Sequence, residues 1–358
     1  MKPRVLIGLL PLLLVHCAGD RPPPAEDTAP LNPAADFAPR SGEPSVDDLA
    51  RFLAGRPVRA GAELSRWQAT NDDYIAYAME TDYLWRKIGL PRTRDQSAYF
   101  ESTLRPVLGS SSTVVYPFGG PDLLHAASVF PRASTYVLVG LEPVGSLPDL
   151  GSGNPNATVA RMARVMEEPL RHGYFITEEM RSAPAATPIL LTSLGLLGAR
   201  VDSVQPVSAG GRSGVELRFR HNGRSKRAIY VSADLSNSGF GGFRPWLDQY
   251  SGATAYFKAA SYLAHDGSFS GIRDWVMSNC RGVLQDDSGI PYKYYVSGNW
   301  DVTLLGSYER PIPLFARWRQ PELAAAYDAI GGRGPAIPFG SGYHLRKGEA
   351  NLQVCRRR

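Results

Sequence analysis

Apolar and polar positions alternate most regularly between Val114 and Pro143, where the chain is VVYPFGGPDLLHAASVFPRASTYVLVGLEP. A short apolar run leads to a Gly-Gly turn, an amphipathic segment follows, and a second apolar run comes after it. Short apolar runs bounded by turn residues are typical of buried strands, and a helical pattern between two of them is typical of a parallel crossover. This stretch therefore predicts a strand, a helix and a second strand.

The flanking sequence predicts further elements of both kinds. Apolar residues at helical spacing run through 45–108, where a Ser-capped segment starts at Ser45. An aromatic series in this part, which we interpret as a packing surface, comprises Trp67, Tyr74, Tyr77, Tyr83 and Trp85. Further helices are expected at 158–175, 187–199, 268–280 and 320–332, and strands at 200–207, 214–221, 227–235, 253–265 (turning helical near its end), 281–292, 300–308 and 337–345. Asn222-Gly223 is a strong hairpin signal between two of these strands.

This order of elements predicts the fold class. Strand–helix–strand patterns occur before and after a pair of hairpin-linked strands. Such an order favours an α/β domain with one mainly parallel, Rossmann-like sheet, covered by helices and carrying an inserted β-hairpin. We expect residues 45–358 to form this single domain, with 45–108 as its helical N-terminal part. A mixed α+β fold is the alternative.

The first residues predict export. A basic start is followed by the apolar run 5–15, which is of signal-peptide length and contains Pro11. Residues 1–19 are therefore expected to be a signal peptide. Cys17 resembles the lipidated cysteine of bacterial lipoproteins, although ordinary cleavage after Gly19 is the rival. Residues 20–44 are rich in Pro, Ala and charge and predict a disordered tether. We expect a periplasmic or envelope protein, anchored to the membrane through Cys17.

Charge and cysteine content narrow the function classes. The net charge of +5 at pH 7 is concentrated partly at the ends of the chain, and no basic stripe is interleaved with aromatic residues, so no nucleic-acid partner is expected. Cys280 and Cys355 would pair in an oxidising compartment or remain as free thiols, and a catalytic thiol is the least favoured option because neither has a nearby catalytic signature.

Four residues of the first strand–helix–strand unit are candidates for ligand binding. Gly119 and Gly120 allow close backbone approach, Asp122 can cap the next helix, and Glu142 follows the second strand. In nucleotide-binding units an acidic residue at that place accepts from ribose hydroxyls. Residues 114–143 resemble the class I S-adenosylmethionine-dependent methyltransferases on these features, with Phe-Gly-Gly-Pro-Asp in place of the spaced G-x-G. The resemblance implies a methyltransferase-like core in which Gly119, Gly120 and Glu142 face a ligand.

Three further candidates follow later strands. Asp286 and Asp287 suit a Mg²⁺ or Ca²⁺ site or general-base catalysis, although a plain Asp-Ser-Gly turn is the alternative. His265 can act as an acid, base or ligand, alone or in a cluster with Asp122 and His125, although a structural role is the favoured alternative for each histidine. The chain has no zinc signature, no G-x-S-x-G elbow and no Walker A motif.

Two function hypotheses remain at this level. The stretch from YPFGGPD to GLEPVG is also similar to uncharacterised exported bacterial proteins, which supports the location and implies no activity. The first hypothesis is an envelope protein that binds a small molecule or is non-catalytic. The alternative is an enzyme, either a metal-assisted hydrolase or a group transferase, and less favourably a methyltransferase, that uses the edge where the strands end. No cofactor is assigned by the sequence. Convergence of all these side chains on one cavity would favour the enzyme.

Overall fold

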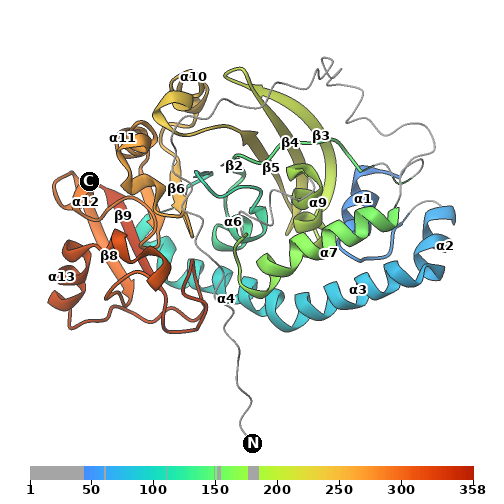
Figure 1. Ribbon diagram of the computed structural model, residues 1–358, viewed down its shortest axis with the longest axis horizontal. Coiled ribbons are helices and arrows are strands. Elements are labelled where there is room, and N and C mark those ends of the chain that lie inside the picture. The colour runs from blue at the N-terminus through green and yellow to red at the C-terminus, as the bar shows by residue number, and fades with distance from the viewer. Residues whose placement is uncertain (1–43, 60–61, 110, 149, 151–154, 176–184) are drawn as a thin grey trace, which may run out of the picture. The chain divides into compact units, whose positions relative to one another are not determined.

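The computed structural model describes residues 44–59, 62–109, 111–148, 150, 155–175 and 185–358 (Figure 1). The described residues fall in one compact unit of the chain. The expected signal peptide, the tether up to residue 43 and Cys17 lie outside the described residues. No helix among the described residues combines the length and the apolar character needed to cross a membrane.

One mixed sheet organises the described residues. Its strands are β1 (Thr113–Tyr116), β2 (Thr135–Gly140), β3 (Arg200–Ala209), β4 (Arg212–His221), β5 (Arg224–Ser232), β6 (Thr254–Phe257), β7 (Gly282–Gln285), β8 (Trp300–Gly306) and β9 (Asn351–Arg357). They lie in the order β3-β4-β5-β2-β1-β6-β7-β9-β8. The protein is therefore an α/β protein, as the alternating pattern predicts.

Parallel strands occupy the middle of this sheet. Strands β5, β2, β1, β6 and β7 run parallel to one another, whereas β3, β4, β8 and β9 are joined through antiparallel pairs. The sheet is therefore mixed, whereas the sequence pattern predicts a mainly parallel one. The chain leaves β1 for β2 on one side, and β6 later pairs with β1 on the other side. At β1 the connections therefore change direction, which is the place where open α/β sheets leave room for a ligand.

Helices flank the sheet (Figure 1). The α-helices are α1 (Val46–Leu53), α2 (Ala62–Thr70), α3 (Asp72–Leu84), α4 (Leu90–Tyr99), α5 (Arg105–Leu108), α6 (Leu123–Val129), α7 (Pro155–Arg171), α9 (Ala186–Leu197), α10 (Asn237–Leu247), α11 (Ser270–Asn279), α12 (Lys293–Val296) and α13 (Pro321–Ala329). Short π-helical turns are η2 (Trp85–Gly89) and η3 (Phe100–Leu104), and 3₁₀ turns are η4 (Asp248–Tyr250), η5 (Leu263–His265), η6 (Gly267–Phe269) and η7 (Pro313–Trp318).

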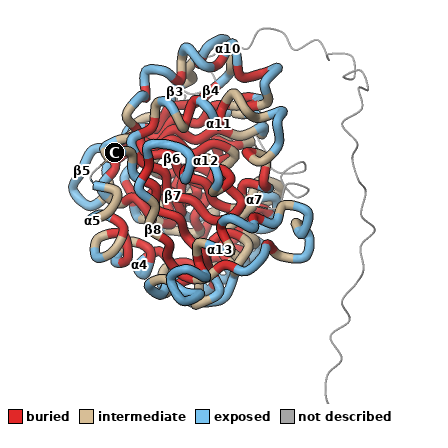
Figure 2. Tube along the Cα trace, turned by 90° about the vertical axis from the view of Figure 1, so that its left-hand side faces the viewer, coloured by how far each residue is buried: buried red, intermediate tan, exposed pale blue. Residues whose placement is uncertain are grey.

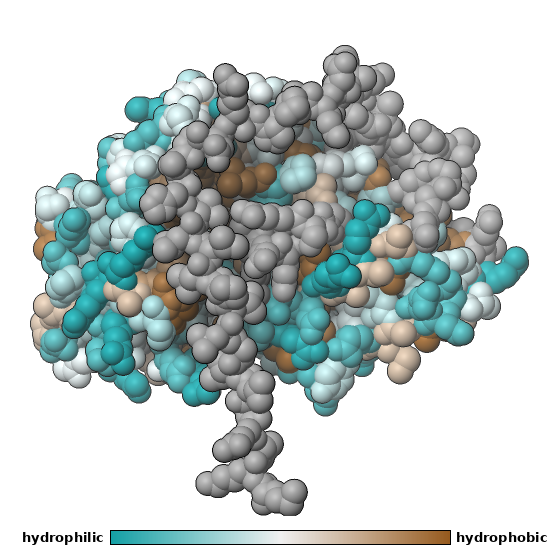
Figure 3. Space-filling model, viewed as in Figure 1, coloured by the Kyte–Doolittle hydropathy of each residue, from teal (hydrophilic) through white to brown (hydrophobic). Residues whose placement is uncertain are grey.

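Each face of the sheet has its own core. Successive residues of a strand point to opposite faces, so Val114 and Tyr116 of β1 join a core with α1, α3, α7 and α9, whereas Val115 joins a core with α10 and α11. Figure 2 shows the strands as a buried centre inside exposed loops and helix surfaces. On the face in Figure 3, most of the visible described residues are hydrophilic, and hydrophobic ones appear as separate small patches.

Local sequence signals account for several boundaries. Ser45 caps α1 by accepting from the amide of Asp48 at 3.1 Å, and this confirms the predicted helix start. Asn222 and Gly223 have φ values of 51° and 72°, as a tight hairpin turn between β4 and β5 requires. These positions confirm the predicted hairpin.

Two predictions about the end of the chain need correction. Residues 337–345 form no strand but a turn with one isolated bridge between Ser341 and His344. The last strand is instead β9, which the pattern did not predict, and it pairs with both β7 and β8. Cys280 and Cys355 are buried and free, so of the options left open the disulfide is excluded.

The aromatic series in the N-terminal part packs as expected at most positions. Tyr74, Tyr77 and Trp85 are buried, and the hydroxyl of Tyr74 donates to the carbonyl of Phe52 at 3.0 Å. Tyr83, however, is 55% exposed and does not belong to this surface.

Candidate functional site

A cavity opens where the connections change direction beside β1. Its volume is about 580 Å³, and its walls come from the segments that follow β1, β2, β5 and β6. The residues just after α7, the η7 region and the loop that carries Tyr343 also line it. A cavity of this size holds a drug-sized or metabolite-sized ligand. We call it the switch-point cavity.

The Gly-Gly turn forms one wall of the switch-point cavity. Phe118 and Gly120 both have positive φ, 60° and 56°. A Cβ at Gly119 would lie 2.6 Å from the Tyr116 ring, and a Cβ at Gly120 would lie 3.2 Å from a carboxylate oxygen of Glu142. Glycine is thus required here by close packing of neighbouring side chains as well as by backbone conformation.

The carboxylate of Glu142 is held in position in this wall. The Tyr230 hydroxyl donates to its Oε2 at 3.0 Å and to its backbone carbonyl at 2.8 Å. A Cβ at Gly140 would lie only 2.2 Å from the same Oε2, so the missing side chain of Gly140 makes room for the carboxylate. Within the described part of the chain nothing donates to Oε1 of Glu142. One oxygen of a positioned carboxylate is therefore free to accept from a ligand.

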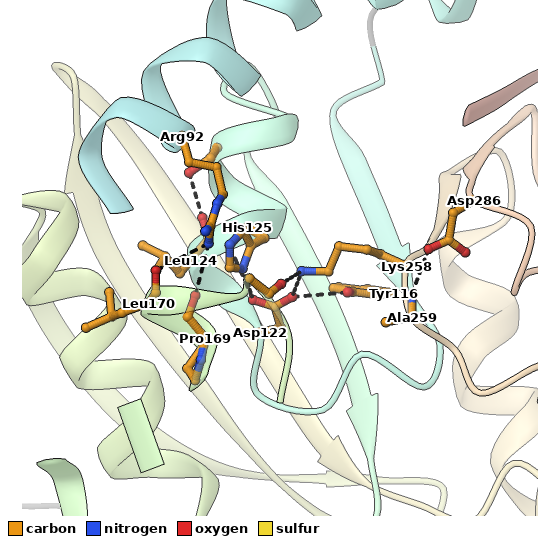
Figure 4. A network of polar contacts seen from close by, with 12 residues as sticks. Arg92, Tyr116, Asp122, Leu124, His125, Pro169, Leu170, Lys258, Ala259 and Asp286 are labelled. Atoms are coloured by element: carbon orange, nitrogen blue, oxygen red, sulfur yellow. Dashed lines mark hydrogen bonds and ion pairs between the residues drawn. The ribbon is translucent and has the colours of Figure 1, made fainter. Parts of the chain in front are cut away.

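The floor of the cavity holds a buried ion pair. Figure 4 shows Asp122, the cap of α6, between His125 and Lys258. Lys258 Nζ donates to Asp122 Oδ2 at 2.5 Å and to the Gly173 carbonyl at 2.5 Å, and His125 Nδ1 lies 2.7 Å from Asp122 Oδ1. The Tyr116 hydroxyl donates to Oδ2 at 3.1 Å. Asp122 therefore already has three side-chain partners.

The protonation states follow from burial and from this pairing. Burial alone would raise the pKa of Asp122, but His125 and Lys258 hold it below its usual value. Burial lowers the pKa of His125 to about 4, against the opposing effect of Asp122, and it also lowers the pKa of Lys258. Near neutral pH we assign a charged Asp122–Lys258 pair and a neutral His125 that donates from Nδ1.

Asp286 lies apart from the cavity wall, in a closed environment after β7. Its carboxylate accepts from the amides of Ala259 and Ser288, both at 2.9 Å, and from the Ser288 hydroxyl at 2.5 Å. Burial, followed by the charge of Asp287, raises the pKa of Asp286 to about 6. This carboxylate fastens the loops after β6 and β7 to each other.

Asp287 is enclosed in a second set of donors. It accepts from the Tyr262 hydroxyl and from Asn351 Nδ2, the latter at 2.9 Å, and His344 Nε2 lies 3.6 Å from Oδ1. Burial would raise its pKa, but the nearby His344 and the hydrogen bonds from Asn351 and Tyr262 hold it lower. The same contact raises the pKa of His344 despite burial.

His265 does not join Asp122 and His125, so the predicted three-residue cluster is wrong. Its ring packs edge-on against Tyr262 and Trp318, with centroids 5.1 and 5.6 Å apart. Its Nε2 is buried without a partner, and burial lowers its pKa to about 4. Among the residues that the structure describes, no group of three or more His, Cys, Asp or Glu side chains is placed to hold a metal ion.

The predicted site residues thus divide into two groups. Those that line the switch-point cavity are Gly119, Gly120, Asp122 and Glu142, and those that do not are His265, Asp286 and Asp287. Sequence reasoning missed Lys258 and Tyr230. Lys258 carries a weak signal, because it directly follows the apolar strand TAYF, but Tyr230 is indistinguishable from an ordinary strand residue.

The fold and this cavity define an α/β protein with a ligand-sized opening at the place where the connections between parallel strands change direction. Comparison with known protein families, with curated proteins and with solved structures gives no match for this chain. The function is therefore argued from the site itself.

Proposed function

We propose that this protein is a ligand-binding envelope protein that takes a small molecule into the switch-point cavity. Export through residues 1–19 and anchoring through Cys17 remain part of this proposal, supported by the apolar run and the abrupt polar switch after it. The core is proposed to be Rossmann-like, and methyltransferase-like as residues 114–143 imply. In support, the five parallel strands lie in the order third, second, first, fourth, fifth along the chain, which matches the Rossmann order.

The main support for the proposal is the positioned carboxylate of Glu142. Two glycines and the Tyr230 hydroxyl hold its carboxylate against the cavity wall, and Oε1 is left without a donor from the described residues. Because Glu142 lines the cavity, a ligand that donates to Oε1 would use this remaining hydrogen-bonding capacity.

Binding is favoured over catalysis because the other carboxylates have no capacity to spare. Asp122 is committed to Lys258, His125 and Tyr116. Asp286 and Asp287 are buried, held by their own donors, and do not line the cavity. A general base must reach the proton that it removes, and none of these groups is presented to the cavity in that way.

Native mass spectrometry of the full chain, purified from the cells that produce it, tests this function. We expect a retained small molecule that is released on unfolding and that Glu142→Ala, which removes the acceptor, retains much less well. Glu322→Ala, at an exposed carboxylate on α13, is the matched control and should retain it fully. An empty wild-type protein, with or without added divalent metal and cell extract, would remove the proposal. Turnover of the bound molecule would favour the enzyme instead.

Labelling with radioactive palmitate tests the anchor. We expect incorporation into the full chain in a bacterial host and its loss in Cys17→Ser. Labelling that persists in this variant would overturn the proposed lipidation, while the cavity proposal would stand.

A further inference from the structure

Two leucines at the mouth of the switch-point cavity are unusually open to solvent. Leu141, after β2, is 74% exposed, and Leu314, in η7, is 66% exposed. Both line the cavity although they are far apart in the sequence. A single exposed leucine needs no explanation, but apolar side chains gathered at one ligand opening indicate a contact surface.

The wall behind these leucines is also apolar. Phe118 and Phe269 meet edge to face with ring centroids 5.5 Å apart, and both line the cavity. On the same cavity lie Ile312, Leu263 and Phe315. Apolar surface therefore extends from the interior of the cavity to its mouth, as a ligand with an extended apolar part would require.

The charges around the cavity exclude some head groups. Among the described lining residues Lys258 is the one basic side chain, and Asp122 already neutralises it. Glu142 and the exposed Asp234 add two carboxylates, and Asp234 is engaged by the amide and hydroxyl of Ser236 at 2.8 and 2.7 Å. Among the described lining residues, a phosphate or carboxylate ligand would find like charge and no free cation. A group that donates to Glu142 Oε1 would be accepted.

From these observations we infer that the ligand is a single-chain amphiphile whose head group is an amine or a hydroxyl. The head group of the ligand donates to Glu142 Oε1. Its alkyl chain follows the Phe118–Phe269 wall toward Leu141 and Leu314. This inference rests on the proposed function, since it names the class of molecule that the switch-point cavity takes. Because each buried methylene strengthens binding roughly fourfold, chain length should dominate affinity and the head group should set selectivity.

Calorimetric titration of the full chain with four dodecyl compounds tests the inference. The probes are dodecylamine, dodecanol, dodecanoate and dodecyl phosphate, each below its solubility limit and below any concentration at which it forms micelles. We expect the amine and the alcohol to bind at least about tenfold more tightly than the two anions, as a lost charge-assisted hydrogen bond and like-charge repulsion predict. Dodecanoate that binds as tightly as dodecylamine would overturn the inference.

Variants separate the head group from the chain. Glu142→Gln keeps an accepting oxygen but loses the charge, so it should weaken dodecylamine about tenfold and leave dodecanol within about threefold. Leu141→Ser and Leu314→Ser should weaken both compounds by a similar factor, about threefold to tenfold each, because they remove apolar contact. The control Val296→Ser changes a side chain that is 65% exposed and lies away from the cavity, and it should have no effect. Binding that none of the cavity variants changes would be adsorption elsewhere and would overturn the inference.

Adenosine, as a flat hydroxylated probe without a chain, distinguishes the failure of the inference from that of the proposed function. If adenosine binds, depends on Glu142 and excludes the dodecyl compounds, the cavity is a ligand site but its ligand is not an amphiphile. If neither adenosine nor any dodecyl compound binds and the purified protein retains no molecule, both proposals fall.

Discussion

Two acidic regions at the ends of parallel strands look alike in the sequence and differ in the structure. Glu142 follows β2, and the pair Asp286–Asp287 follows β7. Glu142 lies on a cavity with one oxygen lacking a donor from the described residues, whereas both aspartates are buried among side-chain and backbone donors.

A position at a strand end therefore does not by itself make a carboxylate available to a ligand. Its availability depends on how many hydrogen-bond donors the surrounding loops supply. Ser288 and Asn351 use up the capacity of the aspartate pair, while Gly140 and Gly120 only make room for Glu142. The first arrangement fastens loops together, and the second presents an acceptor.

The largest expected effect on stability concerns the buried ion pair at the floor of the switch-point cavity. Lys258→Met would leave the buried carboxylate of Asp122 without its cation, with only the hydrogen bonds from His125 and Tyr116. Breaking a buried ion pair in this way typically costs about 3–5 kcal/mol of unfolding free energy. Urea denaturation measures this loss. Lys87→Met, at an exposed position of η2, should change the stability little.

A double variant sharpens the same point. Adding Asp122→Asn to Lys258→Met removes the uncompensated charge and should restore part of the stability. If the double variant is less stable than Lys258→Met by the full cost of a second independent defect, the ion-pair interpretation is wrong.

The pH dependence of stability probes His125. Its pKa of about 4 in the folded protein lies below the ordinary 6.5, so the unfolded chain binds the proton more readily between these values. Stability should therefore fall as the pH drops from about 6.5 to 4, by at most about 3 kcal/mol from this group. His125→Gln should flatten that part of the profile, measured as the urea midpoint against pH. An equally steep profile in His125→Gln would contradict the assignment.

Substitution in the Asp286–Asp287 pair should lower the stability of the protein without affecting ligand binding in the switch-point cavity. Asp287→Asn takes the charged acceptor away from Tyr262, Asn351 and His344 and should cost about 1–3 kcal/mol. The raised pKa of His344, followed by NMR, should fall in this variant because Asp287 causes the shift. Ligand retention in the cavity should stay as in the wild type, and its loss would break the distinction between the two regions.

The smallest effect is expected at Tyr230, whose hydroxyl holds the carboxylate of Glu142. Tyr230→Phe removes one hydroxyl that donates to both the side chain and the backbone of Glu142, which should cost about 1 kcal/mol. Ligand affinity should fall a few fold because the carboxylate is held less firmly. Tyr83→Phe, which alters an exposed hydroxyl, is the control for both measurements.

Local signals predicted much of the fold. The strand–helix–strand unit from β1 to β2, the hairpin at Asn222-Gly223 and the cap at Ser45 each depend on neighbouring residues alone. Strand β9 was missed because its partners are remote. Asn351 and Gln353 are fully buried in it, and Gln353 accepts from Gln285 of β7 at 3.1 Å, so its polar sequence gives no strand signal by itself.

The candidate site was predictable only in part for the same reason. Gly119, Gly120, Asp122 and Glu142 come from one continuous unit whose geometry the sequence pattern constrains. The partners that decide the chemistry come from β5 and from the loop after β6, as Tyr230 and Lys258. Whether a carboxylate is saturated depends on such long-range contacts, which periodicity does not reveal.

A crystal structure of the protein with bound dodecylamine shows directly whether Glu142 recognises the head group. We expect electron density for the amine nitrogen at hydrogen-bonding distance, about 2.7–2.9 Å, from Glu142 Oε1, with the alkyl chain of the ligand running between Phe118 and Leu314. Density at Asp286 and Asp287, or a cavity that stays empty while the protein binds dodecylamine elsewhere, would contradict it.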